Sequence, residues 1–381
     1  MTTDQPGRVG LRTVLREWGR IGCIGFGGPP AHIALLRRLC VVDRGWLEDR
    51  EFEDAVAACN LLPGPASTQL AIFCAWRVRG RLGALLGGAA FILPGLVVIL
   101  GLAVLFLAGS PPLWVRGAGA GAGAAVAAVA VQAGAGLAPA SWRGAVQHRS
   151  RLRWSAYLLA GGLAAALLGP WLVVVLLACG LIEIAARGLR PVTAQLPLLA
   201  GGGAVLLPLI WVAVKVGALS YGGGFVIIPL MRTDAVDRYH WMTGAQFLNA
   251  VALGQITPGP VVQTVAVVGY AAAGLGGGLL AALVAFAPSF AFILLGAYRF
   301  DRLRGNQRAR AFLDGAGPAA IGAILGTAVP LALALSRPWQ YAVLAGAAVL
   351  LLPLRRGVVL TLVAAAAAGV VVALAGGPLP S

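Results

Sequence analysis

Several long apolar runs limit the folds open to this chain. Residues 91–108, 154–178, 341–354 and 358–375 carry no charged side chain. An α-helix that crosses a bilayer needs about 20 consecutive, predominantly apolar residues. Because backbone groups in lipid must bond internally, such runs form helices rather than open sheets. The runs therefore predict an all-α polytopic membrane protein.

The charge pattern agrees with a membrane location. Only 11% of the residues are charged, whereas a soluble globular chain carries roughly a quarter. The net charge is +16, but the arginines cluster in short segments between apolar runs. Such segments set membrane orientation, so we expect contact with lipid and no nucleic-acid partner. The polar, basic N-terminus shows no cleavable signal peptide, and we expect the first helix to remain attached.

The chain contains an internal duplication. A shift of 195 positions superimposes its halves without a gap, and 16 identities fall between residues 22 and 71. Duplicated apolar halves are typical of secondary transporters, whose substrate sites lie between the repeats near the membrane midplane. We expect one repeat over residues 1–190 and the other over 191–381.

The arginines indicate that the two repeats are inverted. Arg77, Arg79 and Arg81 have no basic counterpart in residues 272–276, whereas residues 299–310 hold five arginines against a single Arg116 in the first half. Because cytoplasmic loops concentrate Lys and Arg, matching loops should face opposite sides. The alternative is that residues 154–186 fold as a short hairpin, which would place two basic loops on one side and conflict with inversion by the parity of crossings.

Each half has a glycine-rich interruption near its start. Gly27 and Gly28 precede Pro29 in the first half, and Gly222 and Gly223 are their counterparts in the second. Glycine permits positive φ, and proline suits the first position of a new helix. These patterns predict broken helices, which in membranes line a cavity. The alternative is a notch of small residues for helix packing.

A Pro-Gly-Pro segment stands between two apolar stretches in each half. The segments are residues 63–65 and 258–260. If the second proline takes the first helical position, backbone N–H groups of residues 67–69 and 262–264 remain free. A helix N-terminus carries roughly half a positive charge and binds phosphate or sulfate, so we expect a tetrahedral dianion here. The alternative is a proline kink that only bends the helix.

Arg20 and Lys215 form a matched pair of cations under the same shift. A charge inside a membrane segment is costly and marks a pathway or paired site, although Arg20 could instead reach the surface from a helix end. Carboxylates are few, and those of residues 48–54 align with neutral residues of the second half under the 195-residue shift. An acid-poor core favours an anion over a cation. Glu183 and Asp314 stand alone in the sequence.

The sequence lacks the patterns of an enzyme or a metalloprotein. The three histidines share no spacing with Cys or acidic residues of the kind a metal site needs. No nucleophile elbow, phosphate-binding loop or nucleotide fingerprint occurs. We therefore expect no enzymatic activity, no metal and no cofactor, with transport driven by a gradient or the membrane potential.

These motifs resemble the CHR family of chromate transporters in its long, two-domain form. The similarity rests on residues 26–29, 32–34, 46–47, 62–65 and 69–70, and on residues 221–224, 255, 257–260 and 269–270. The resemblance implies export of chromate from the bacterial cytoplasm across the inner membrane as a resistance mechanism, with sulfate as a competitor. It also implies halves of opposite topology. A homodimer is a further expectation.

Motifs and resemblance together define the expected oxyanion site. Its residues are Arg20, Gly27, Gly28, His32, Pro63, Gly64, Pro65, Ser67, Gln69, Lys215, Gly222, Gly223, Gln255, Thr257, Pro258, Gly259, Pro260 and Gln263. Three alternatives stay open: a carrier of sulfate or another oxyanion, an anion channel, and a non-transporting membrane scaffold or sensor.

Overall fold

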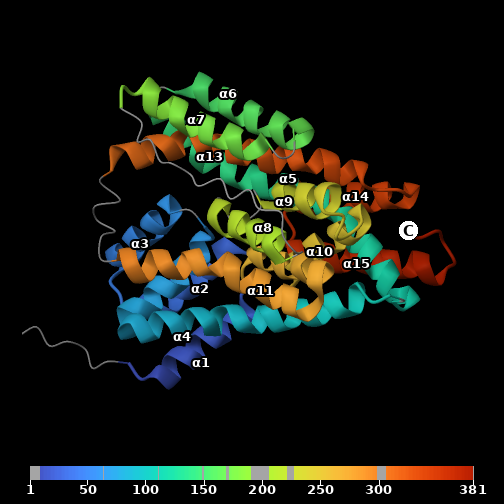
Figure 1. Cartoon of the computed structure of the whole chain (residues 1–381), viewed down its shortest axis with the longest axis horizontal. Coiled ribbons are helices and arrows are strands. Elements are labelled where there is room, and N and C mark those ends of the chain that lie inside the picture. The colour runs from blue at the N-terminus through green and yellow to red at the C-terminus, as the bar shows by residue number, and fades with distance from the viewer. Residues whose placement is uncertain are drawn as a thin grey trace, which may run out of the picture.

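The computed structural model describes residues 9–62, 64–109, 111–147, 150–168, 171–189, 206–220, 227–297 and 306–380. Within these ranges every regular element is a helix (Figure 1), which confirms the all-α prediction. The first half holds α1 (Leu11–Ile24), α2 (Pro29–Arg37), η1 (Arg38–Asp43), α3 (Asp49–Leu61), α4 (Ala66–Phe106), α5 (Leu113–Gln147), α6 (Arg151–Leu163), η2 (Ala164–Leu168) and α7 (Leu172–Ala186). The second holds α8 (Leu206–Leu219), α9 (Ile227–Arg232), η4 (Thr233–Arg238), α10 (Gly244–Ile256), η5 (Val261–Gln263), α11 (Thr264–Gly296), α13 (Gln307–Leu333), α14 (Pro338–Leu351) and α15 (Val358–Leu374).

Long apolar helices make the chain a multi-pass membrane protein. By length and composition α4, α5, α11 and α13 can cross a bilayer, and α7, α8, α14 and α15 are shorter apolar helices. Large apolar side chains such as Val97 on α4 and Leu283 on α11 are exposed on the surface. Lipid rather than water is the solvent that suits these faces.

Both α4 and α11 contain a sharp reversal that the sequence analysis did not foresee. Gly80 in α4 has φ 67° and ψ −155°, and Gly274 in α11 has φ 64° and ψ −158°. Only glycine adopts this backbone region readily. After each reversal the chain folds back on itself: a Cβ placed on Gly88 would lie 2.8 Å from Ile72 Cγ1. Each element is therefore a hairpin of a short and a long helix.

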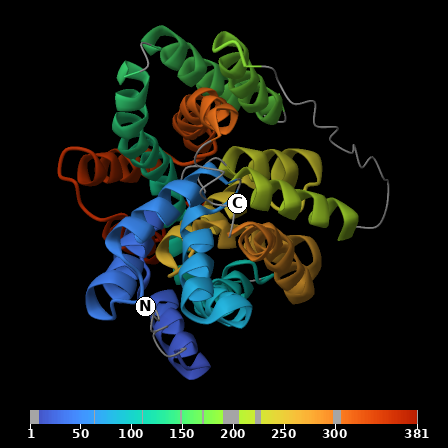
Figure 2. The same cartoon turned by 90° about the vertical axis from the view of Figure 1, so that its left-hand side faces the viewer.

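The two halves exchange helices with each other. The pair α6 and α7 of the first half packs on α13 of the second, and the pair α14 and α15 of the second packs on α5 of the first. Figure 1 shows α6 and α7 above α13, and Figure 2 shows α13 end on beside them. In the same paired fashion α1 packs on α4 and α8 packs on α11. The repeats are thus intertwined, not two separable bundles.

The packing of α4 on α11 confirms that the repeats are inverted. A Cβ on Gly88 would lie 2.6 Å from Cζ of Phe290, and a Cβ on Gly278 would lie 2.6 Å from Cδ2 of Leu100. The later residue of α4, Leu100, thus contacts the earlier residue of α11, Gly278. These matching helices therefore run antiparallel. Matching helices of opposite direction are what an inverted repeat requires.

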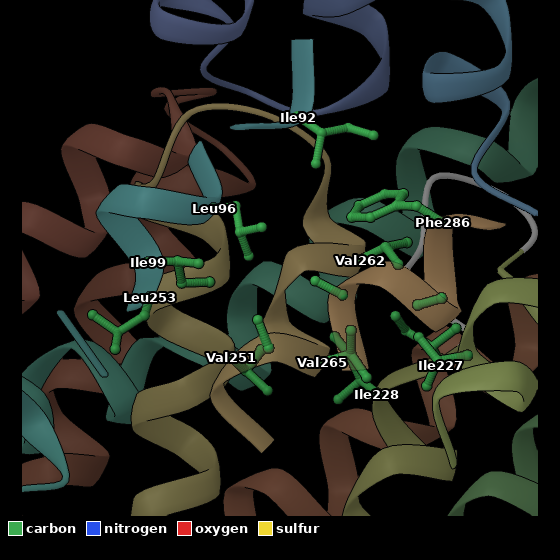
Figure 3. Close-up of a cluster of buried hydrophobic side chains, with 14 of the residues drawn as sticks. Ile92, Leu96, Ile99, Ile227, Ile228, Val251, Leu253, Val262, Val265 and Phe286 are labelled. Carbon is green, nitrogen blue, oxygen red and sulfur yellow. The ribbon is translucent and has the colours of Figure 1, made fainter. Parts of the chain in front are cut away.

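The core between the halves is built from branched aliphatic side chains. Ile92 and Ile99 of α4 and Ile227 and Ile228 of α9 belong to one buried cluster. Figure 3 shows these residues around the chain that leads into α11, with Val262 and Val265 among them. Close packing of branched residues fixes the relative position of four elements, which in turn positions the Pro-Gly-Pro loops.

Ion pairs gather basic residues at one end of the bundle, called here the basic end. Arg153 at the start of α6 bonds Glu183 at 2.8 Å, and Arg187 at the end of α7 bonds Asp314 of α13 at 2.8 Å. Tyr157 also donates to Glu183, which is 1% exposed. Glu183 and Asp314, which stand alone in the sequence, therefore gain arginine partners through folding.

The hairpin alternative for residues 154–186 is confirmed together with the inversion. The start of α6 and the end of α7 meet at the basic end, which includes Arg187. The parity of crossings depends on the path of the chain that connects the halves. Most of that connection, residues 190–205, lies outside the described residues, and so does the proposed repeat boundary at 190. The boundary stays a prediction.

Candidate functional site

The Pro-Gly-Pro loop of each half meets the other half. The Gly259 N–H donates to the Gly25 carbonyl oxygen at 2.9 Å, which joins the second loop to the glycine break of the first half. On the other side, a Cβ on Gly64 would lie 3.2 Å from the Gly217 carbonyl oxygen of α8. The sequence-predicted loops and the first break are therefore brought together at the boundary between the repeats.

Both loops lie near the middle of the long helices. Gly95 packs directly against the Pro258 carbonyl, and it is central in the long arm of α4, residues 81–106, which is about 39 Å long at 1.5 Å per residue. The first loop has the equivalent position, because a Cβ on Gly64 would lie 3.4 Å from Ser289 Oγ in the long arm of α11. A helix of this length spans the bilayer, so the loops lie at mid-depth.

Glycine is required at the centre of each loop. Gly64 has φ 118° and Gly259 has φ 96°, a region that other residues rarely adopt. Gly27 and Gly28 also have positive φ, and Pro29 takes the first position of α2 as predicted. Pro63, Gly222 and Gly223 lie outside the described residues. Pro65, Pro258 and Pro260 are buried with the loops.

The helix starts after the loops differ from the prediction. Pro65 and Pro260 precede the first helical residue instead of occupying that position. Their carbonyls then accept the N–H groups of the first turn, including Gln69 to Pro65 at 3.0 Å and Gln263 to Pro260 at 2.9 Å. The N–H groups of Thr68 and Thr264 are bonded in the same turns. The expectation of free N–H groups was therefore wrong for these four residues, and nothing tests it for Ser67 and Val262.

His32 connects the first break to the first loop. It is fully buried; its Nε2 lies 2.9 Å from the Gly25 carbonyl oxygen and its Nδ1 lies 3.2 Å from Ser67 Oγ. A carbonyl only accepts, so Nε2 carries a proton, and in the neutral ring Nδ1 accepts from Ser67. The Gly25 carbonyl oxygen thus accepts two hydrogen bonds, one from His32 Nε2 and one from the Gly259 N–H. Within the described ranges, no cluster of three or more His, Cys, Asp or Glu suits a metal ion.

Buried polar atoms without a hydrogen-bond partner gather at this junction. Within the described part of the chain they include the hydroxyls of Thr68, Ser220 and Ser289, Nε2 of Gln255 and Oε1 of Gln263. The amide nitrogen of Gln263 donates to the Ile92 carbonyl oxygen at 2.8 Å, which fixes its orientation. A buried polar group is almost always bonded, and an unpaired one costs roughly 1–3 kcal/mol. Such atoms at the loops suit a polar ligand.

Two more of the predicted site residues, Thr257 and Gln69, lie buried at the loops. Thr257 Oγ1 donates to the Leu253 carbonyl oxygen at 2.8 Å, and Gln69 is fully buried beside Gly64. Ser289 and Ser220 were not among the residues predicted for the site. A signal for Ser220 existed, because it corresponds to Gly25 under the 195-residue shift. Ser289 corresponds to Gly95 at a shift of 194 residues, where Pro94 also matches Pro288. The 195-residue shift that aligns the motifs does not reveal this match, and folding brings Ser289 to Gly64.

The two predicted cations have different surroundings. The side chain of Arg20 is 69% exposed and lies 3.9 Å from Glu17, so it belongs to the surface of α1. Lys215 forms an ion pair with Asp234, and its Nζ lies 5.8 Å from the ring centre of Trp211. The structure therefore does not bring the two cations together. Asp234, 4% exposed, was missed because its counterpart in the first half is Leu39.

Comparison with known proteins gives a consistent picture. A family model described as chromate transporter matches residues 12–184 and 201–370. The chain is 32% identical to a chromate transport protein of Cupriavidus metallidurans, over 84% of this chain and 82% of that protein. It is 31% identical to a chromate transport protein of Pseudomonas aeruginosa, over 82% and 79%. An uncharacterized transporter of Methanocaldococcus jannaschii is 28% identical, over 75% and 76%. No solved structure matches the chain.

Proposed function

Because the chain belongs to the chromate transporter family, we propose that it carries chromate across the bacterial inner membrane and out of the cytoplasm. One observation carries the proposal: buried polar atoms without partners lie at two loops, which are linked through His32 and the Gly25 carbonyl at mid-depth between inverted repeats. Hydroxyl and amide donors of Thr68, Ser220, Ser289 and Gln255 suit the oxygens of a tetrahedral oxyanion. Binding would satisfy groups that the closed conformation leaves unpaired.

The basic end sets the proposed orientation. Arg77, Arg79 and Arg81 surround the reversal in α4, whereas the matching reversal in α11 has no basic neighbour within the same span. Cytoplasmic segments are enriched in Lys and Arg, so the basic end faces the cytoplasm. Chromate would enter from this end and leave at the other, where the C-terminus lies in Figure 1.

The contact between the halves supports a carrier with alternating access. The described loop residues from Gly64 to Pro65 and from Thr257 to Pro260 are buried. The Gly259–Gly25 hydrogen bond is a contact between the repeats that opening on one side would break. In transporters built from inverted repeats, one repeat rocks against the other around a fixed site. An anion channel would need no such closed state.

Lys215 is the proposed cation of the site, and its charge is paired with Asp234 in the absence of an anion. The pair is mostly buried, and Lys215 lies on α8, the helix whose Gly217 contacts the first loop. A dianion at the loops would compete with the Asp234 carboxylate for the ammonium group. Arg20 has a weaker case, because its charge is largely exposed. Sulfate is the second candidate substrate, since the same donors recognise any tetrahedral dianion. The proposed export would confer chromate resistance, and we propose that the protein forms a homodimer.

Uptake of radiolabelled chromate into everted membrane vesicles tests this function. Vesicles containing the parent chain should accumulate chromate, excess sulfate should compete, and Lys215→Ala should lose uptake while inserting normally. The matched control is Arg20→Ala, which removes an exposed cation and should retain most of the uptake. Absence of chromate uptake with sulfate uptake present would favour the sulfate carrier. Absence of both under any imposed gradient would favour the scaffold or sensor.

A further inference from the structure

A polar cavity lies at the end of the bundle opposite the basic end. It has a volume of about 290 Å³ and is lined by residues of α5 from the first half and of α10 and α14 from the second. Its polar side chains are Arg116, Thr243, Gln246, Asn249 and Gln340. A water molecule occupies about 30 Å³ of the liquid, so the cavity has room for a small hydrated ion.

The lining has the chemistry of an anion site. Arg116 is the single charged side chain among the residues that line the cavity, and none of the lining residues is acidic. None of the ion pairs among the described residues includes Arg116. A guanidinium with five N–H donors and no carboxylate partner recognises oxyanions.

Neutral donors surround this cation. The Gln246 amide oxygen accepts from the Thr243 N–H at 2.8 Å, so its NH₂ group is the part left for a ligand. Gly119 gives the Asn249 side chain room, because a Cβ there would lie 2.8 Å from Nδ2. The N-terminal turns of α5, α10 and α14 all contribute lining residues. Their dipoles add positive potential to that of Arg116.

The matching positions of the first half differ in charge. Under the 195-residue shift Gln246 corresponds to Glu51 and Asn249 to Asp54, and Glu51 forms an ion pair with Arg77 at the basic end. The two matching segments therefore differ in charge at these positions: acidic at the basic end and neutral at the cavity. An acid-free lining occurs at the end where an exported anion would emerge.

We propose that this cavity is a second oxyanion site, an outer vestibule in which Arg116, Gln246 and Asn249 bind the tetrahedral dianion between the central loops and the outside. The inference rests on the proposed function for the direction of transport. Binding of the anion in the cavity does not depend on it. The second loop follows directly at the other end of α10, which places the vestibule and the central site at opposite ends of one helix.

Equilibrium dialysis of radiolabelled sulfate against the purified full chain at fixed ionic strength tests the vestibule. Arg116→Gln removes the cation, and Gln246→Glu adds the acid of the first half while keeping a residue suited to the helix cap. We expect each variant to weaken one class of sulfate site at least tenfold. The control Arg355→Gln removes an equal charge from a residue outside the lining and should bind like the parent chain.

Two outcomes overturn the vestibule. One is sulfate binding by Arg116→Gln and Gln246→Glu that equals that of the parent; the other is equal weakening by Arg355→Gln, which would report net charge only. A parent chain that moves no chromate would refute the proposed function, whereas dialysis would still decide whether the cavity binds the anion.

Discussion

Removing the carboxylate of Asp234 isolates the charge of Lys215. The two side chains are 6% and 18% exposed, so Asp234→Asn keeps the shape of the pair and leaves a cation that water reaches poorly. Removal of one partner from a buried ion pair costs roughly 3–5 kcal/mol. Because Lys215 is partly exposed and keeps the Trp211 ring at 5.8 Å, we expect a loss near the lower limit, about 3 kcal/mol of unfolding free energy.

The same substitution should strengthen binding of an anion. Two unit charges about 4 Å apart attract by about 4 kcal/mol at an effective dielectric constant of 20. Partial exposure reduces this, and we expect about 1–2 kcal/mol of attraction to become available to a bound dianion, or roughly a 5- to 30-fold tighter complex. The variant is therefore less stable without the anion and more strongly stabilised by it.

Thermal unfolding of the purified chain over a sulfate titration measures both effects. The unfolding midpoint of Asp234→Asn should start below that of the parent and rise more steeply with sulfate, because a ligand that binds only the folded state stabilises it by mass action. The matched control is Asp237→Asn, whose side chain is 48% exposed and lies 3.3 Å from Arg232. A sulfate response of Asp234→Asn equal to that of the parent and the control would refute the role of Lys215.

Three further substitutions test other parts of the structure. Gly259→Ala should lower the free energy of unfolding by about 1–3 kcal/mol and abolish chromate uptake, because φ 96° strains any other residue. The control Gly276→Ala has open space around it and should lower neither. Unfolding midpoints and vesicle uptake measure both effects. Glu183→Gln should cost about 3–5 kcal/mol in thermal unfolding, since two arginines bond this buried carboxylate, whereas Asp314→Asn, 44% exposed, should cost less than about 1 kcal/mol. His32→Phe should impair uptake more than stability, because it removes the bond to Gly25; equal uptake by a well-expressed variant would contradict its positioning role.

Sequence periodicity and repetition predicted the architecture well, for physical reasons. Apolar runs without charge have few alternatives to membrane helices, and two copies of one pattern must build similar elements. The start of α2 at Pro29 followed from backbone restrictions of single residues. The reversals at Gly80 and Gly274 escaped notice because they match at a shift of 194 residues, one less than the shift that aligns the motifs.

The candidate site was predicted less completely, because its groups meet only through folding. The two loops were identified from Gly64 and Gly259, but which half each loop contacts depends on the antiparallel packing of α4 and α11. The partner of Lys215 was hidden, since Asp234 has no matching acid in the first half. Arg20 was matched in sequence to Lys215 although it lies at the surface. Matching positions in inverted repeats share backbone geometry, whereas their side chains have diverged.

Accumulation of radiolabelled chromate by the purified chain in proteoliposomes tests the central claim most directly. The parent chain should concentrate chromate above its equilibrium level under an imposed gradient, and the double variant Gln263→Leu, Ser289→Ala, which removes unpaired polar atoms at both loops, should lose this. The control Thr327→Ala removes a buried hydroxyl that bonds within α13 and should accumulate chromate like the parent. Equal accumulation by the double variant would contradict a site between the loops, and equilibration without accumulation by the parent would contradict a carrier.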